Sequence, residues 1–148
     1  MVRLFDKYEF PEGLYYSKDH MWAKVEDGKV RVGLTDFGQQ MAGKILMVRP
    51  RPTGTTVEQG KMLGTMETGK WVGPLRAPVS GVIAEFNGAM RTVGTAGLAN
   101  KDPYWKGWMF YLEPTNLQND LKNLMTDSKE IEEWLKEEIK KMEKESKG

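Results

Sequence analysis

The chain has 148 residues, of which 39% are hydrophobic and 10% aromatic, a size and composition that allow one hydrophobic core. Its 22 basic and 21 acidic residues nearly cancel, so no field of one sign is available to attract a nucleic acid or an anionic membrane. The absence of cysteine excludes disulfides, thiolate zinc sites, iron–sulfur clusters and thiol nucleophiles, and a single histidine excludes a metal site built from several histidines. We therefore predict a protein with no metal, no nucleic-acid partner and no membrane partner.

The first residues, "MVRLFDKYEF", are interrupted by charge every few positions, and the chain contains no run of 18 apolar residues. A secretory signal needs an uninterrupted apolar segment, and a spanning helix needs a longer one. We therefore predict a cytoplasmic location. Residues 1–13 are predicted to be an N-terminal extension.

Short strands separated by turns are predicted next. The segment "WAKVEDGKVRVGL" alternates apolar and polar residues on both sides of an Asp-Gly pair, which predicts a β-hairpin with a primed turn over residues 22–34. In "TDFGQQMAGKI", Thr35 is a candidate N-cap for a short helix over residues 36–41, and Gly43 follows its end. The segment "KILMVRPRPTGTTV" then predicts a strand that stops at its prolines.

The middle of the chain continues the β pattern. Strands are predicted over residues 61–67, 71–76 and 82–86, with tight turns over residues 68–70 and 78–81. The glycine-rich segment after these strands predicts a helical turn near Ala89, and "WMFYLEP" predicts a closing strand. Many short strands at regular spacing are typical of a barrel or a sandwich.

The composition changes after Pro114, where glycine disappears until the last residue. Apolar residues then recur at helical spacing, at Ile131, Trp134, Leu135, Ile139 and Met142. Thr126 or Ser128 is the candidate N-cap, and acidic residues near the start with lysines near the end suit the helix dipole. Residues 118–148 are therefore predicted to be a helical segment with a charged tail. It either docks on the protein by its apolar stripe or binds a partner with it.

The segment "TMETGKWVGPLRAPVSG" places one lysine, Lys70, between Gly69 and Trp71 at a predicted hairpin turn. A Schiff-base lysine needs burial or a neighbouring cation to lower its pKa, whereas the flanking glycine predicts exposure. A phosphate-binding loop needs Ser or Thr after the lysine and a helix beyond it, but here Trp71 and a strand follow. Two roles stay open: a carrier lysine that is acylated by a cofactor, and an ordinary solvated turn lysine.

The same segment resembles the lipoylation site of the glycine cleavage system H-protein family, in which a glutamate precedes the modified lysine by three residues and an "SPVSG" turn closes the next strand. Further segments resemble the family in its order: "YYSKDHMWAKVEDGKVRVGLTDFGQQMAG", "TTVEQGKMLGTMET" and "NKDPYWKGWMFYLEPTNL". This resemblance implies a mainly β barrel-sandwich hybrid of two small antiparallel sheets, with short flanking helices and a C-terminal helix. The lipoyl-carrier domain would cover residues 14–117.

The resemblance also implies that Lys70 carries lipoate in amide linkage. The other site residues that we assign around it are Glu67, Thr68, Gly69, Trp71 and Gly81. The two glycines are expected to hold turn conformations that are costly for a residue with a Cβ. Trp71 stands where the family has alanine, and it either lies beside the arm facing partners or points along the strand as a packing residue.

By resemblance, the chain is a non-catalytic carrier rather than an enzyme. A lipoate ligase or lipoyl transferase would load Lys70, and the arm would shuttle an aminomethyl group among glycine decarboxylase, aminomethyltransferase and dihydrolipoamide dehydrogenase. A first alternative is an H-like lipoate-binding protein that carries sulfur intermediates for a heterodisulfide-reductase-like sulfur-oxidation complex, because "ETGKWVGP" looks closer to that branch. A second alternative is an unmodified adaptor with the same fold. An enzyme acting through Lys70 or His20 is disfavoured because no base, nucleophile or metal cluster accompanies either residue in the sequence.

Overall fold

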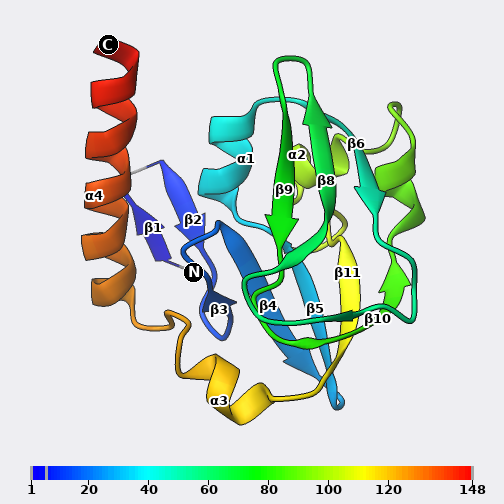
Figure 1. Ribbon diagram of the computed structural model, residues 1–148. Coiled ribbons are helices and arrows are strands. Elements are labelled where there is room, and N and C mark those ends of the chain that lie inside the picture. Colours follow the sequence, from blue (N-terminus) through cyan, green and yellow to red (C-terminus); the bar gives the residue numbers. More distant parts are fainter. Residues whose placement is uncertain (1, 6, 148) are drawn as a thin grey trace.

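The computed structural model describes residues 2–5 and 7–147. Within this part of the chain the strands form three antiparallel sheets, which Figure 1 shows together with the helices. The smallest sheet pairs β1 (Val2–Leu4) with β2 (Tyr8–Phe10). The largest has the order β3 (Tyr15–Tyr16), β4 (Met21–Glu26), β5 (Lys29–Leu34), β11 (Phe110–Pro114), β10 (Gly81–Phe86), β7 (Thr56–Val57). The third has the order β6 (Ile45–Pro50), β8 (Met62–Thr68), β9 (Val72–Arg76).

Short helices flank the sheets, and a longer one ends the described chain. They are α1 (Asp36–Ala42), the 3₁₀ turn η1 (Gly88–Arg91), α2 (Leu98–Lys101), α3 (Leu117–Leu121) and α4 (Ser128–Lys147). The 3₁₀ turn corresponds to the helical turn predicted near Ala89. Among the described residues, no helix combines the length and the apolar character that crossing a bilayer requires.

The hairpin predicted over residues 22–34 is confirmed as β4 and β5. Its turn residues Asp27 and Gly28 have φ angles of 46° and 78°, which is the left-handed backbone of a primed turn. Trp22 of β4 faces Gly33 of β5 across the ladder and is 0% exposed. A Cβ on Gly33 would lie 2.7 Å from Nε1 of Trp22, so the absence of a side chain lets the indole approach the strand closely.

The predicted N-cap of the first helix is also confirmed. The hydroxyl of Thr35 accepts a hydrogen bond from the Gly38 backbone N–H at 3.0 Å. Gly43 follows the helix with a φ of 79°, a conformation that disfavours side chains and helps to end α1. This helix carries the buried Phe37 toward the molecule's interior.

The main core lies between the six-stranded and the three-stranded sheet. Buried side chains from both sheets form one cluster, for example Val32 and Leu112 from the larger sheet with Leu63 and Leu75 from the smaller. The predicted mainly β sandwich is therefore confirmed. The β1–β2 sheet was not predicted, because its three-residue strands are interrupted by charge and give no alternating pattern.

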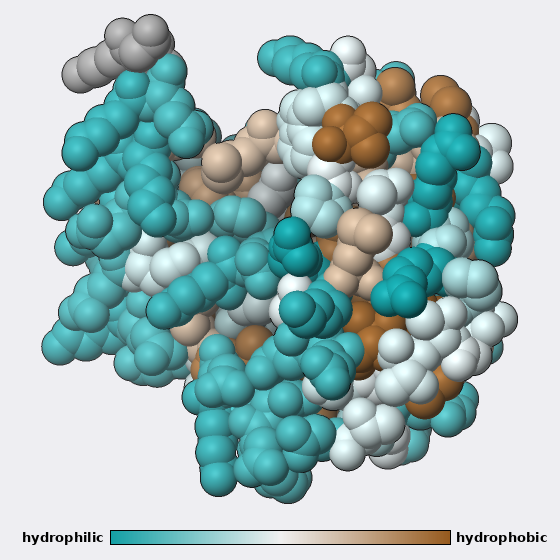
Figure 2. Space-filling view, viewed as in Figure 1, coloured by the Kyte–Doolittle hydropathy of each residue, from teal (hydrophilic) through white to brown (hydrophobic). Residues whose placement is uncertain are grey.

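The C-terminal helix α4 docks on the body of the protein. Ile131 and Leu135 are 3% and 0% exposed in a second cluster that also contains Tyr8 and Phe10 of β2. Figure 1 shows α4 beside the β1–β2 hairpin, and Figure 2 shows a hydrophilic outward side on this helix. The docked interpretation is thus confirmed, and the stripe is not free for a partner. The cap prediction was wrong by one residue, because Asp127 precedes the helix and its carbonyl accepts from the Ile131 N–H at 3.0 Å.

Candidate functional site: the β8–β9 hairpin and the adjacent groove

Lys70 lies in the turn that joins β8 to β9. The strands pair with Glu67 opposite Val72 and Met66 opposite Gly73, so the turn covers residues 69–71. Figure 1 shows this turn projecting at the top of the molecule. Lys70 is exposed, as the sequence predicts. Since β8 also pairs with β6 on its other side, the turn extends from the central strand of a sheet and is held in place by it.

Thr68, the last residue of β8, shapes the turn. Its hydroxyl oxygen accepts hydrogen bonds from the backbone N–H groups of Lys70 and Trp71, both at 3.2 Å. Its own N–H donates to the Trp71 carbonyl at 3.0 Å, and its side chain is buried. The expectation for Gly69 was wrong: its φ lies outside the left-handed region, and a Cβ there would meet nothing within 4 Å. The side chain of Thr68 therefore shapes the turn, and the backbone freedom that we predicted for Gly69 is not needed.

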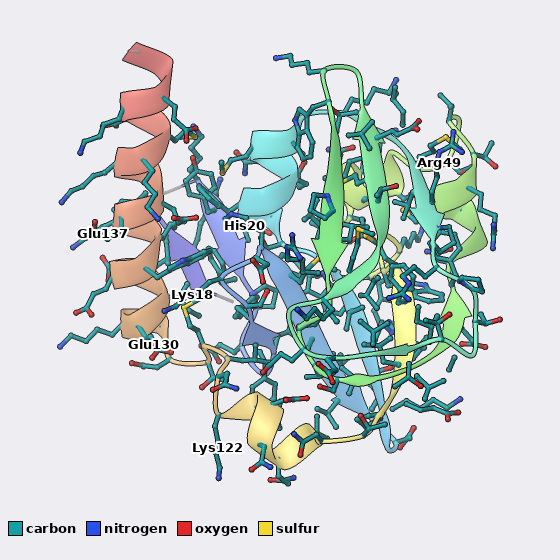
Figure 3. All side chains as sticks on the ribbon, viewed as in Figure 1. Lys18, His20, Arg49, Lys122, Glu130 and Glu137 are labelled. Carbon is teal, nitrogen blue, oxygen red and sulfur yellow. The ribbon has the colours of Figure 1, made fainter. Side chains whose placement is uncertain are left out.

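Glu67 is paired within the sheet. Its Oε1 lies 3.0 Å from Nε of Arg49 on the neighbouring strand β6, and Figure 3 labels Arg49 on that side of the molecule. Partly exposed ion pairs of this kind contribute at most about 1 kcal/mol to stability. The pair nevertheless gives the carboxylate a defined position on the strand leading to Lys70.

Gly81 is remote from the turn and serves the other sheet. It begins β10, opposite Pro114 of β11, and a Cβ on it would lie 2.6 Å from the Glu113 carbonyl oxygen. A side chain there is costly, as expected, but the cause is a close approach of two strands, because the φ of Gly81 is not left-handed. The preceding turn is fastened by a residue that the sequence did not reveal, Asp120, whose Oδ2 accepts from the Ser80 N–H at 2.7 Å.

Trp71, the last residue of the turn, points along the strand that follows it, β9. Trp71 directly precedes β9, and a Cβ on Gly73 would collide with Cζ3 at the edge of the six-membered ring of the Trp71 indole. The edge of the indole therefore lies against Gly73, while the side chain remains 43% exposed. Of the two orientations left open by the sequence, the structure has the one along the strand.

A groove of about 270 Å³ begins at this indole. One wall comes from the hairpin, through Met66, Trp71 and Leu75, and the facing wall comes from α1, through Met41. These side chains are apolar, and the polar part of the lining consists of Asp19 and His20 in the loop before β4. The sequence did not indicate this groove, because its two walls come from segments more than 20 positions apart.

His20 connects the groove with the C-terminal helix. Its ring lies between Phe37 and Trp134, at centroid distances of 5.5 and 5.4 Å, and its Nε2 is 3.4 Å from Oε1 of Glu138. Figure 3 shows His20 between α4 and the sheet that carries the hairpin. Burial lowers the pKa of His20 below its ordinary value, and the carboxylates of Glu138 and Asp19 oppose that shift. Its buried Nδ1 has no hydrogen-bond partner among the described residues.

Comparisons with known proteins agree with the resemblance seen in the sequence. The model of the family described as glycine cleavage H-protein matches residues 14–138. Glycine cleavage system H protein 2 of Aquifex aeolicus is 42% identical over 133 residues, which cover 88% of this chain and 81% of that protein. A probable glycine cleavage system H protein of Thermococcus kodakarensis is 41% identical over 131 residues, which cover 88% of this chain and 95% of the relative.

A solved structure gives the same result for the fold. The crystal structure of a glycine cleavage system H protein from Mycobacterium marinum superposes with a TM-score of 0.71 at 33% identity. The superposition covers 81% of this chain and 94% of the other. The solved structure agrees with the fold described above, and the family model and the relatives match most of the sequence; the chain therefore belongs to the glycine cleavage H-protein family.

Proposed function

We propose that this chain is a non-catalytic lipoyl carrier of the glycine cleavage system, with lipoate joined to Lys70 by an amide bond. The observation that carries the proposal is the position of Lys70, exposed in a turn that extends from the central strand of a sheet. A modifying enzyme must take the lysine amine into its own active site. This requires an exposed lysine that is attached to a rigid part of the protein. The names of the relatives support glycine cleavage as the pathway.

The residues around Lys70 suit a carrier. Thr68 orders the turn through its side chain, so the backbone on both sides of the lysine has a defined geometry without burial of the lysine itself. Lipoate attached there would supply a dithiolane on a long flexible arm, which can be reduced and can carry a group from one active site to another. The neighbouring groove, with Met41, Met66 and Trp71 in its walls, is of a chemistry that accepts a hydrocarbon chain bearing sulfur.

The chemistry would be done by partner enzymes. Glu67, three residues before Lys70, is engaged by Arg49, which supports a positioning rather than an acid–base role for this carboxylate. The expected partners are a lipoate ligase or lipoyl transferase for loading, followed by glycine decarboxylase, aminomethyltransferase and dihydrolipoamide dehydrogenase. The comparisons give no support to the alternative in which the arm carries sulfur intermediates for a heterodisulfide-reductase-like complex.

Loading is tested by intact mass spectrometry. Incubation of the chain with lipoate, ATP and a lipoate ligase should add the mass of one lipoyl group, and Lys70→Arg should abolish the addition while keeping the fold. Lys61→Arg is the matched control, because Lys61 is an exposed lysine that precedes the same hairpin. An unchanged mass of the native chain with several competent ligases, or a modified Lys70→Arg chain, would contradict the proposal.

The pathway is tested separately by exchange of bicarbonate with the carboxyl group of glycine. The lipoylated chain, supplied with glycine decarboxylase, should support exchange, and the Lys70→Arg chain should not. Full lipoylation without exchange, in an assay where an established H protein is active, would reject glycine cleavage while leaving the carrier role intact.

A further inference from the structure

The loop that carries Lys70 does not adopt the turn that its sequence favours. Thr68 and Trp71 close this loop, and the Thr68 N–H donates to the Trp71 carbonyl at 3.0 Å. Between them lie only Gly69 and Lys70. A glycine at the first position of a two-residue hairpin loop is typical of a type II′ turn, in which that glycine has a positive φ. Neither Gly69 nor Lys70 has a positive φ, so the loop is not a primed turn.

The β4–β5 hairpin provides a reference within the same protein. Its loop also has two residues, Asp27 and Gly28, and both have left-handed φ angles. Such a backbone matches the twist of the two flanking strands, whereas a turn without positive φ tends to splay them. The β8–β9 hairpin therefore needs another interaction to hold its loop closed.

The hydroxyl of Thr68 supplies that interaction. Its oxygen accepts hydrogen bonds from the N–H groups of Lys70 and Trp71 at 3.2 Å, and it donates to the Trp71 carbonyl at 3.3 Å. In a turn closed by backbone groups alone, the N–H of the fourth residue donates to the carbonyl of the first. Here the N–H of the fourth residue, Trp71, donates to the side chain of the first, Thr68. Thr68 is buried, so water competes little for these bonds.

Gly69 would let the loop change its turn type if the hydroxyl were absent. A Cβ on Gly69 would meet nothing within 4 Å, and glycine adopts positive and negative φ about equally readily. Conversion to a type II′ turn would rotate the peptide groups on both sides of Lys70 and point its side chain in another direction. The hydrogen bonds of the Thr68 hydroxyl hold the loop in the observed turn.

We infer that Thr68 is a positioning residue for the loading of Lys70, because its hydroxyl keeps the loop out of the type II′ turn and so presents the lysine in one direction. This inference rests on the proposed lipoylation of Lys70. In loading, the lysine amine attacks the carboxyl carbon of lipoate that ATP has activated; the amide C–N bond forms, AMP leaves and the amine gives up a proton. An enzyme that accepts the lysine from one direction binds only the chains with the correct turn. Loss of the hydroxyl should therefore raise KM and leave kcat nearly unchanged.

The first test measures the kinetics of loading by a lipoate ligase. Thr68→Val keeps the shape of the side chain and removes the hydroxyl, and kcat/KM should fall about fivefold, the factor that corresponds to about 1 kcal/mol of lost hydrogen bonding. Thr68→Ser keeps the hydroxyl and should load at nearly the native rate. Gly69→Ala added to Thr68→Val should recover part of the loss, because alanine disfavours the positive φ that a type II′ turn needs.

The second test measures hydrogen exchange of the backbone amides by NMR on the unloaded chain. The amides of Lys70 and Trp71 should exchange about fivefold faster in Thr68→Val than in the native chain, because they lose the oxygen that accepts from them. Thr65→Val is the matched control. Thr65 lies three residues earlier on β8 and takes no part in the hydrogen bonds of the turn, so its substitution should change neither the exchange of these amides nor the loading kinetics.

Loading of the native chain separates two kinds of failure. A native chain that no competent ligase loads fails the proposed function, and the positioning role of Thr68 fails with it. If the native chain is loaded, equal kcat/KM in Thr68→Val overturns the positioning role alone. The same holds for a Thr68→Ser chain as slow as Thr68→Val, for no recovery with Gly69→Ala, and for unchanged amide exchange in Thr68→Val. Thermal melting shows whether each variant is folded, and Thr68→Ala, which also lacks the hydroxyl, decides if Thr68→Val does not fold.

Discussion

Two tryptophans of this protein lie against glycines, and the two pairs differ in where they are. Trp22 lies on Gly33 of the neighbouring strand and is completely buried. Trp71 lies against Gly73, two residues further along the chain, and is 43% exposed. In both pairs the glycine removes the Cβ that would hold the indole away from the backbone.

The two tryptophan–glycine pairs differ in their surroundings, so they should differ in what they contribute to the protein. Trp22 is enclosed by the second core cluster, and its Nε1 donates to the Pro103 carbonyl at 3.0 Å, so its full apolar area contributes to folding. Trp71 lines the groove and belongs to neither core cluster. The first pair should therefore contribute much more to stability than the second.

The largest expected effect comes from removing the buried indole. Trp22→Ala should lower the free energy of unfolding by about 3–5 kcal/mol, because it deletes a fully buried aromatic side chain and leaves a cavity. Trp71→Ala should cost less than half as much, since much of that side chain is already in water. Equilibrium denaturation in urea measures both, and equal losses would break the distinction between the two pairs.

Gly81→Val should come next. Here the obstacle is the backbone of β11, 2.6 Å from the added Cβ, and a strand moves less readily than a ring. We expect a loss near the upper end of the range of about 1–3 kcal/mol that overpacking usually costs. Gly88→Ala, where a Cβ meets open space, is the matched control and should change the melting temperature little.

Substitution of the glycine beside the buried tryptophan should lower stability more than substitution of the glycine beside the exposed one. Gly33→Ala should cost about 1–3 kcal/mol, because the Trp22 ring has no free volume into which it can shift. Gly73→Ala should cost about 0.5 kcal/mol or less, because the Trp71 ring can swing into solvent. Urea unfolding of the two single variants measures both losses of unfolding free energy. A larger loss for Gly73→Ala than for Gly33→Ala would show that the exposed indole of Trp71 contributes more to stability than the buried indole of Trp22.

The smallest effect concerns the pH dependence of stability where α4 meets the groove. The pKa of His20 is lowered by burial from 6.5, the value expected when the chain is unfolded, while Glu138 and Asp19 oppose the shift. A histidine whose folded pKa is lowered contributes stability above the unfolded pKa, and this contribution is lost as the pH falls through 6.5 toward the folded pKa. Urea unfolding from about pH 8 to about pH 5.5 should therefore show a steeper loss in the native chain than in His20→Gln. Parallel pH profiles would mean that His20 takes no part in the acid response.

Much of the fold follows from signals carried by neighbouring residues. The Asp-Gly pair determines the turn of the β4–β5 hairpin because few other pairs accept two left-handed residues in succession. Thr35 caps α1 because its hydroxyl reaches an N–H three residues ahead. The sequence also places Lys70 in an exposed turn, because the alternation of apolar and polar residues in the two flanking strands is itself a local pattern.

What the sequence by itself left undetermined depends on residues far apart in the chain. Gly81 is required by the approach of β11, and the turn before it is fastened by Asp120, contacts that no local pattern announces. The orientation of Trp71 was open because an indole beside a turn can point either way until the surface beneath it is known. Only the tertiary placement of the β8–β9 hairpin opposite α1 created the groove and gave the indole a place in its wall. Local backbone preference acts within a few residues, whereas side-chain direction and cavities are decided by the surfaces that tertiary structure brings together.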